Sequence, residues 1–312
     1  MTADPRRPTA ILIAGPTASG KSAAALELAD RLGGTVINAD SMQVYRELSV
    51  LTARPKPAEM AAVPHALYGT VPAAEAYSVG RWLADVAAAM KAAQRQGRVP
   101  VLVGGTGLYF KALLEGLSPV PDIPNETRAF WREQSDRLGP EDLFHALRSR
   151  DPVMAARLEP ADLQRVVRAI EVIDATGVSL AEWQGTAGTP TLAGDGVRKL
   201  VIAPERAPLY AKIDARFDRM IEGGAIDEVR AFAALRLDPG LPAMRAHGAR
   251  ELVAYLGGAM TLEQAATKAK TETRHYAKRQ MTWLKRFMMD WDWHPDGASA
   301  VAAAGVLFPA ED

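Results

Sequence analysis

Short apolar runs alternate with helical patterns in the first hundred residues of the chain. Residues 10–14 and 99–103 are apolar runs, and residues 35–38 contain Val36 and Ile37, over lengths that suit buried strands. An Ala- and Leu-rich segment at 21–32 predicts one helix, and a second segment predicts another that begins after Ser78 and stops at Gly97. This alternation predicts a parallel sheet with helices packed against it.

The pattern changes after residue 118. Three prolines between 119 and 124 interrupt the chain, and helical patterns without strand signals follow near 125–138, 140–149 and 161–176. We expect Asn125 to cap the first of these helices, and Asp151 followed by Pro152 is typical of a helix start. A loop at 185–197 leads to an apolar run at 199–203, which we expect to rejoin the sheet. The predicted organisation is a core domain of residues 1–118 and 198–312 with an all-helical insertion domain at 119–197.

Composition excludes several classes of protein. The chain has 312 residues, of which 48% are hydrophobic, so it can bury a sizeable core. It contains no cysteine, which excludes disulfide scaffolds and cysteine-ligated zinc and favours a reducing, cytoplasmic location. No apolar stretch approaches the roughly 20 residues of a membrane span, so we expect a soluble protein without a membrane partner.

Charge gives no global attraction to nucleic acid, because 37 basic side chains balance 37 acidic ones. Basic residues nevertheless gather between positions 268 and 286, where Glu272 is the only acid. Lys270, Arg274 and Lys278 recur every four residues there and would form a stripe on one helix face. Such a stripe suits a phosphate backbone, although a solvated helix face has the same pattern.

A glycine-rich turn between the first predicted strand and helix matches the phosphate-binding pattern G-x-x-x-x-G-K-[ST]. The turn consists of Gly15, Pro16, Thr17, Ala18, Ser19, Gly20, Lys21 and Ser22. In such a loop the backbone N–H groups and the helix N-terminus bind two linked phosphates, Lys21 adds positive charge, and the Ser22 hydroxyl can ligate Mg²⁺. The fold class that follows is α/β, with a P-loop NTPase-like parallel sheet flanked by helices and the helical insertion.

The pattern identifies a diphosphate ligand and leaves the reaction open. The run at 99–103 ends in Gly104 and Gly105, where P-loop ATPases and GTPases place an aspartate for magnesium. No N-K-x-D motif for reading guanine occurs. An ordinary ATPase or GTPase is therefore disfavoured, whereas a small-molecule or nucleotide kinase remains an alternative, and a nucleic-acid-binding switch without chemistry ranks last.

Several further motifs follow in order. D-S-M-Q-V-Y begins at Asp40, T-A-R-P at Thr52, and G-G-T-G-L-Y at Gly104, while Pro64 with His65 lies between the second and third. Later segments, at 162–168, 216–217 and 277–284, complete the set. Together they resemble the bacterial tRNA dimethylallyltransferase (isopentenyl-diphosphate:tRNA transferase) family over residues 10–290. Two positions depart from the family pattern: Leu51 stands where glycine is usual and Ala249 where an aromatic residue is usual.

The resemblance implies transfer of the dimethylallyl group from dimethylallyl diphosphate to N6 of the adenosine 3′ of the anticodon, with Mg²⁺ as cofactor and the anticodon stem-loop of tRNA as partner. The catalytic residues it implies are Asp40, Lys21, Thr106 and Arg216. Asp40 would be the general base, although an aspartate there can also cap the following turn or hold a magnesium-bound water. Thr106 would bond the donor or the base, or be an ordinary turn residue. We expect a monomer.

The tRNA-binding residues come from the same resemblance. On a helix, Val166 and Val167 fall opposite the polar face, yet they belong to the family's tRNA motif. The full set comprises Asp40, Ser41, Met42, Gln43, Thr106, Arg128, Gln164, Arg165, Val166, Val167, Arg168, Arg245 and Arg250. Gln43 in particular can pair with an adenine edge. We expect His65 and His247 to have structural roles.

Overall fold

The computed structural model describes residues 8–307, and the chain divides into two compact units. The core unit contains residues 1–114 and 191–312, and the helical unit contains residues 115–190. The division thus falls a few residues earlier at each end than the segment 119–197 expected from the sequence. The returning chain joins the core unit early because the N–H groups of Thr191 and Leu192 both donate to the Leu113 carbonyl, at 2.9 and 3.0 Å.

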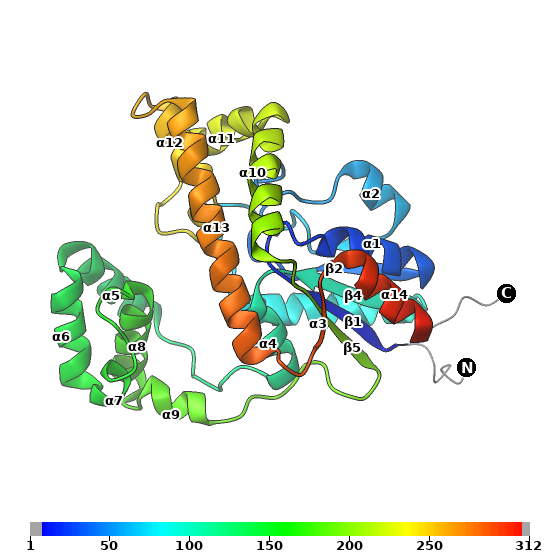
Figure 1. The fold of residues 1–312 in the computed structure, drawn as a ribbon. Coiled ribbons are helices and arrows are strands. Elements are labelled where there is room, and N and C mark those ends of the chain that lie inside the picture. The colour runs from blue at the N-terminus through cyan, green and yellow to red at the C-terminus, as the bar shows by residue number, and fades with distance from the viewer. Residues whose placement is uncertain (1–7, 308–312) are drawn as a thin grey trace. The chain divides into compact units, whose positions relative to one another are not determined.

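The core unit is built on a six-stranded sheet, in agreement with the predicted parallel fold (Figure 1). Its strands are β1 (Ala10–Ala14), β2 (Gly34–Asn38), β3 (His65–Ala66), β4 (Val99–Gly104), β5 (Val197–Ile202) and β6 (Asp292–His294). They are ordered β3-β2-β4-β1-β5-β6, and every neighbouring pair is parallel. The edge strands β3 and β6 escaped prediction because two or three residues are too few for a periodic signal.

Each face of the sheet carries its own helices, because successive side chains of a strand point to opposite sides. Ile11 and Ile13 pack with α1 (Lys21–Arg31) and α14 (Gly297–Leu307). Leu12, on the other face, shares a core cluster with residues of α3 (Val79–Arg95) and α4 (Gly107–Glu115). The carboxyl ends of the central strands β1, β2 and β4 therefore lie at one edge of a buried scaffold, where such sheets bind ligands.

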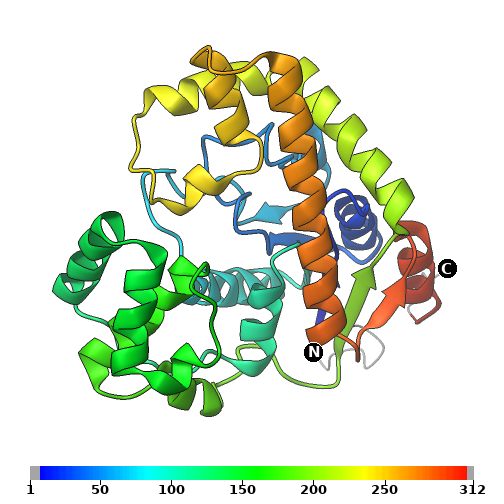
Figure 2. The same cartoon turned by 60° about the vertical axis from the view of Figure 1, so that its left-hand side comes forward.

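The rest of the core unit is helical (Figures 1 and 2). Its elements are α2 (Pro57–Ala62), α10 (Arg206–Glu222), α11 (Ala225–Ala234), the 3-10 helix η1 (Pro242–Arg245), α12 (Ala249–Leu256) and α13 (Leu262–Phe287). In both views α10 and the long helix α13 run alongside each other. Ser78 caps α3 as expected, accepting a hydrogen bond from the Arg81 N–H.

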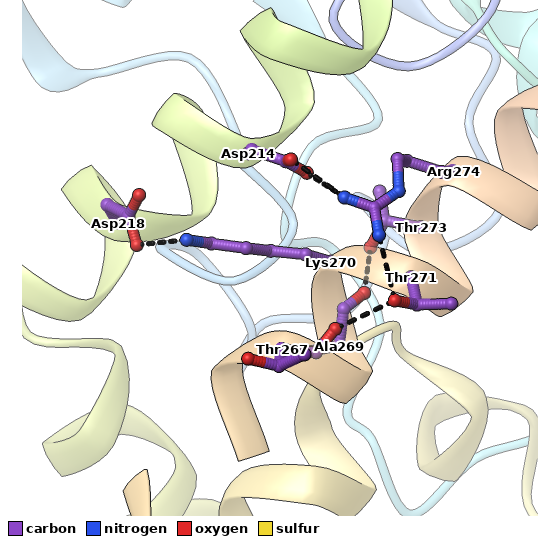
Figure 3. A network of polar contacts seen from close by, with 8 residues as sticks. All are labelled: Asp214, Asp218, Thr267, Ala269, Lys270, Thr271, Thr273 and Arg274. Carbon is purple, nitrogen blue, oxygen red and sulfur yellow. Dashed lines mark hydrogen bonds and ion pairs between the residues drawn. The ribbon is translucent and has the colours of Figure 1, made fainter. Parts of the chain in front are cut away.

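Ion pairs join α13 to α10 (Figure 3). The Lys270 ammonium lies 2.6 Å from Asp218, and one guanidinium nitrogen of Arg274 contacts both carboxylate oxygens of Asp214 at 2.7 and 2.8 Å. Two of the three residues in the basic stripe are therefore engaged by acids within the core unit. The expectation that this stripe faces a phosphate backbone is corrected for Lys270 and Arg274, because α10 presents acidic residues to them.

The helical unit contains five helices and no strand, of which the patterns predicted three helices, the start of a fourth and the lack of strands. They are α5 (Asn125–Arg137), α6 (Pro140–Arg150), α7 (Pro152–Ala155), α8 (Leu163–Thr176) and α9 (Leu180–Gly185). Asp151 caps α7 by accepting from the Met154 N–H at 2.9 Å, as expected. Asn125 does not cap α5, because it is already the first helical residue and follows Pro124 at the cap position. Across residues 8–307, no helix is both long and apolar enough to cross a bilayer.

Candidate active site

The loop between β1 and α1 has the backbone shape of a phosphate-binding turn. Ala18 and Gly20 have positive φ angles of 62° and 93°, left-handed conformations that are typical of loops that bind anions through backbone N–H groups. Position 15 requires glycine because a Cβ there would clash with the neighbouring strand β5, lying 2.6 Å from the Ile202 carbonyl oxygen. The Ser19 hydroxyl is buried and has no hydrogen-bond partner within the described residues. The loop thus retains an unused polar group that an oxygen-rich ligand would satisfy.

Lys21 begins α1 and is 9% exposed. Its ammonium donates to the Pro16 carbonyl at 3.0 Å, across the mouth of the loop. Burial lowers the pKa of Lys21 to about 8, an effect that the negative charge of Asp40 opposes. The side chain still carries its proton at neutral pH, and its charge is poorly solvated. An anionic ligand would therefore be strongly favoured beside it.

Asp40 lies two residues after the end of β2 and lines the candidate pocket. One of its carboxylate oxygens accepts from the Met42 N–H at 2.9 Å, which is the turn-capping role considered as an alternative. Its backbone N–H donates to the Asn38 amide oxygen at 2.8 Å, so the residue is held from both sides. Capping and catalysis are compatible here, because a carboxylate has a second oxygen.

Thr106 joins the loops that follow β2 and β4. Its hydroxyl oxygen accepts from the Ser41 N–H at 3.0 Å and lies 3.3 Å from the Ser41 hydroxyl. Thr106 is not among the residues that line the pocket. The contact with Ser41, next to Asp40 in the chain, makes Thr106 a support for the Asp40 loop.

A pocket opens beside these loops within the core unit. Its volume is about 640 Å³, which includes the solvent space at its open mouth. Its polar end contains Thr17, Asp40 and Arg216, and the Arg216 guanidinium lies 3.5 Å from the Thr17 hydroxyl. Burial lowers the pKa of Arg216, again against the charge of Asp40. The remaining lining residues are mostly apolar: Ala18, Met42, Leu51, Thr52, Ile213, Phe217, Met220, His247, Thr273 and Tyr276.

Most of the apolar wall was missed by the sequence reasoning. Ile213, Phe217 and Met220 come from α10, at a spacing that places them on one helix face with Arg216. Their periodicity indicated only a buried face and could not say that part of it lines a pocket. The family-like segment at 216–217 was the one available signal.

His247 and Tyr276 are neighbours in the pocket wall, with ring centroids 4.3 Å apart. Burial lowers the pKa of His247, and Arg279 reinforces this effect, so the imidazole is neutral at physiological pH. We expected a structural role for His247, whereas its ring lines the pocket. His65 has a local contact, its Nδ1 lying 2.6 Å from the Val63 carbonyl.

The expected tRNA-contacting residues of the core unit lie in different settings. Met42 lines the pocket and Ser41 bonds Thr106. The Gln43 amide nitrogen donates to the carbonyls of Thr52 and Ala53, at 2.9 and 3.1 Å, so its donors already hold the neighbouring loop. Arg245 and Arg250 are exposed, one in η1 and one in α12.

In the helical unit the expected contacts separate by burial. Arg128, Gln164 and Arg165 are exposed and Arg168 is half-buried. Val166 is fully buried in the core cluster of this unit, so its side chain cannot contact tRNA and its assignment is corrected, whereas Val167 packs against the same cluster and is half-buried. The helix places them on the face opposite the polar residues, toward the interior of the unit.

The two positions that depart from the family pattern are both buried in the core unit. Leu51 lines the pocket, and its N–H donates to the Glu228 carboxylate at 2.8 Å. Ala249 is the first residue of α12. A Cβ on Gly248 would lie 3.2 Å from the Leu51 side chain and 2.8 Å from the Phe217 ring, so this wall is closely packed.

No group of three or more histidine, cysteine, aspartate or glutamate side chains suited to a metal ion occurs in residues 8–307. Ser22 is exposed in the first turn of α1. A magnesium ion here would therefore take most of its ligands from a bound diphosphate and from water, which is how Mg²⁺ is commonly bound. The residues fit that arrangement.

The fold and the site define a P-loop protein whose pocket joins a loop of the phosphate-binding pattern to an apolar wall. Residues 43–287 match the family model "IPP transferase", and residues 8–68 match "Isopentenyl transferase". The chain belongs to the IPP transferase family.

Relatives named tRNA dimethylallyltransferase match nearly the whole chain. The protein from Rhodopseudomonas palustris is 53% identical over 296 residues, covering 95% of this chain and 92% of that one. The protein from Bradyrhizobium sp. strain ORS 278 is likewise 53% identical over 296 residues, covering 95% and 96%.

Solved structures agree. The tRNA isopentenylpyrophosphate transferase of Bacillus halodurans is 33% identical, covers 95% of this chain and 96% of its own, and superposes with a TM-score of 0.67. A eukaryotic dimethylallyltransferase acting on tRNA is 28% identical with a TM-score of 0.74, covering 88% of this chain and 69% of its own.

Proposed function

We propose that the chain transfers the dimethylallyl group of dimethylallyl diphosphate to N6 of the adenosine 3′ of the anticodon in tRNA, releasing diphosphate. The observation that carries the proposal is the pocket, whose polar end is the phosphate loop and whose wall is apolar. A prenyl diphosphate has the same two halves. An ATP-dependent kinase would need no apolar wall of this kind next to its γ-phosphate.

In the proposed reaction, the N6 nitrogen forms a bond to C1 of the dimethylallyl group while the bond from C1 to the diphosphate oxygen breaks. The bonding electrons leave with the diphosphate, and the N6 proton passes to the Asp40 carboxylate. Lys21 and Arg216 counter the negative charge that grows on the leaving group, and their poor solvation strengthens this effect. The apolar wall excludes water from the allylic carbon.

Mg²⁺ is the proposed cofactor. The Ser22 hydroxyl would hold it together with diphosphate oxygens, and the ion supplies charge neutralisation when bound. Lys21 and Arg216 supply two positive charges beside the loop, fewer than the negative charges of a diphosphate. We propose that the chain acts as a monomer, and we place the reaction in the cytoplasm with its tRNA substrate.

The target adenosine must leave the stack of the anticodon loop to reach Asp40. We assign the tRNA contacts to the expected residues that are exposed or half-buried, which removes the buried Val166 from the original set. These are Asp40, Ser41, Met42, Gln43, Arg245 and Arg250 in the core unit, with Thr106 acting through Ser41, and Arg128, Gln164, Arg165, Val167 and Arg168 in the helical unit.

The test is incubation with labelled dimethylallyl diphosphate, Mg²⁺ and unmodified tRNA, with a parallel arm of labelled ATP and candidate acceptors. Asp40→Asn keeps an oxygen for the Met42 N–H and removes the base, so we expect a fall in kcat of about 10²- to 10⁴-fold with the fold intact. Asp30→Asn, an exposed change on α1, is the control and should be neutral. Phosphate transfer without prenyl transfer by the unaltered chain would refute the proposal.

A further inference from the structure

Gln280 is a buried polar side chain of α13 that contacts two loops distant from it in the chain. It is 6% exposed. Its amide oxygen accepts from the Thr17 N–H at 2.9 Å, and its amide nitrogen donates to the Gly105 carbonyl at 2.9 Å. One side chain thus bridges the phosphate loop after β1 and the loop after β4.

The bridge lies in a closely packed setting. A Cβ on Gly105 would lie 2.2 Å from the Gln280 amide nitrogen and 3.4 Å from the Gly15 carbonyl oxygen. A Cβ on Gly107, the first residue of α4, would lie 2.2 Å from the ring of Trp283, about one turn after Gln280 on α13. Helix α13 therefore packs directly on Gly105 and Gly107, and the bridge has little freedom to lengthen.

Each of the two loops joined by Gln280 also contacts a residue in or next to the polar end of the pocket. On one side, the Thr17 hydroxyl lies 3.5 Å from the Arg216 guanidinium in the polar end of the pocket. On the other side, Gly105 is followed by Thr106, whose hydroxyl accepts from Ser41, the residue after Asp40. A continuous set of contacts thus runs from the phosphate loop through Gln280 to the Asp40 loop.

We infer that Gln280 is a positioning residue that sets the separation between the bound diphosphate and Asp40. The inference rests on the proposed function. Because the Thr17 N–H is occupied by Gln280, this amide holds the loop in shape instead of binding phosphate. Loss of the bridge lets the two loops move independently, so the leaving group and the base no longer align in the transition state.

Two substitutions test the bridge. Gln280→Met keeps the length of the side chain and removes both hydrogen bonds, while Gln280→Glu keeps an acceptor for Thr17 and loses the donor to Gly105. The matched control is Gln264→Glu, which adds the same charge near the exposed N-terminus of α13, where glutamate can still complete the capping box. Steady-state kinetics for both substrates and melting temperatures are measured for each variant.

We expect Gln280→Met to lower kcat about tenfold or more while the KM for tRNA changes less than about twofold. The glutamate variant supplies a second readout, because a protonated carboxyl can donate to the Gly105 carbonyl as the amide does. Its kcat relative to the unaltered enzyme should therefore rise as pH falls from about 8 to about 6. A role confined to stability would leave this ratio flat.

A folded Gln280→Met variant with unaltered kcat would overturn the inference. If that variant fails to fold, the pH dependence of the glutamate variant decides, and a flat ratio counts against the inference. Absence of prenyl transfer by the unaltered chain would count against the proposed function alone. The two failures are therefore distinguishable in one set of assays.

Discussion

Replacing Lys21 by methionine separates the stability of the core unit from its capacity to bind diphosphate. Burial lowers the pKa of Lys21 from an ordinary 10.5 to about 8. At ~1.4 kcal/mol for each tenfold change in a proton equilibrium, this difference destabilises the charged folded form by about 3 kcal/mol. The hydrogen bond to the Pro16 carbonyl offsets part of the loss, so about 3 kcal/mol is an upper value.

The sign of the pH dependence follows from proton binding. Below about pH 8 the lysine is charged in both folded and unfolded chains, and the full penalty is present. Between about 8 and 10.5 the unfolded chain binds more protons than the folded one, so stability rises with pH on account of this residue. Lys21→Met should therefore raise the free energy of unfolding at pH 7, by up to about 3 kcal/mol, and the gap should close toward pH 10.5.

Denaturant unfolding of both proteins at several pH values measures the gap, with Lys91→Met as the control. Lys91 is exposed on α3, and its replacement should change stability by less than ~0.5 kcal/mol. Titration with diphosphate and Mg²⁺ should show binding by the unaltered chain and its loss in Lys21→Met. A methionine variant that is less stable at pH 7, or whose advantage does not vary with pH, would refute the reasoning.

Two further predictions concern packing around the site. The Glu228 carboxylate accepts from the N–H groups of Ser49, Val50 and Leu51 at 2.6, 2.8 and 2.8 Å, so Glu228→Ala should lower the free energy of unfolding by about 3 kcal/mol and weaken donor binding. Asp227→Asn, on the same helix but exposed, should change neither, and equal effects in denaturant unfolding would contradict this assignment. Arg274→Met should cost about 1 kcal/mol and leave the KM for tRNA within about twofold, because Asp214 engages the guanidinium. A double-mutant cycle with Asp214→Asn measures the coupling, and a large change in tRNA affinity without loss of stability would contradict it.

Much of the architecture could be predicted because its signals are local in the chain. The strands at 10–14 and 99–103, the caps at Ser78 and Asp151 and the phosphate loop each occupy a few consecutive residues. A strand followed by a glycine-rich turn and a helix allows few other structures. The parallel direction of the strands then follows from the alternation of strands and helices along the chain.

The set of residues that line the pocket depends on tertiary packing and could not be predicted from the sequence. Thr17, Asp40 and Tyr276 lie far apart in the chain and meet because α10 and α13 lie beside the loops. Periodicity marks the buried face of such helices, but a face that packs on protein and one that lines a pocket have the same pattern of apolar residues. Gln280 shows what the sequence could not predict. The role of its buried amide depends on the backbone groups of Thr17 and Gly105 to which it is hydrogen-bonded.

The tertiary structure also changed the role expected for two basic residues of α13. In the sequence Lys270 and Arg274 are simply basic residues of an exposed-looking helix, and only the approach of α10 shows that acids neutralise them. The sequence by itself therefore determined the longer helices, the central strands and the glycine-rich loop, which depend on neighbours in the chain. The three-dimensional fold decided which side chains face the ligand and which face each other, because those contacts join residues whose separation in sequence carries no information about distance.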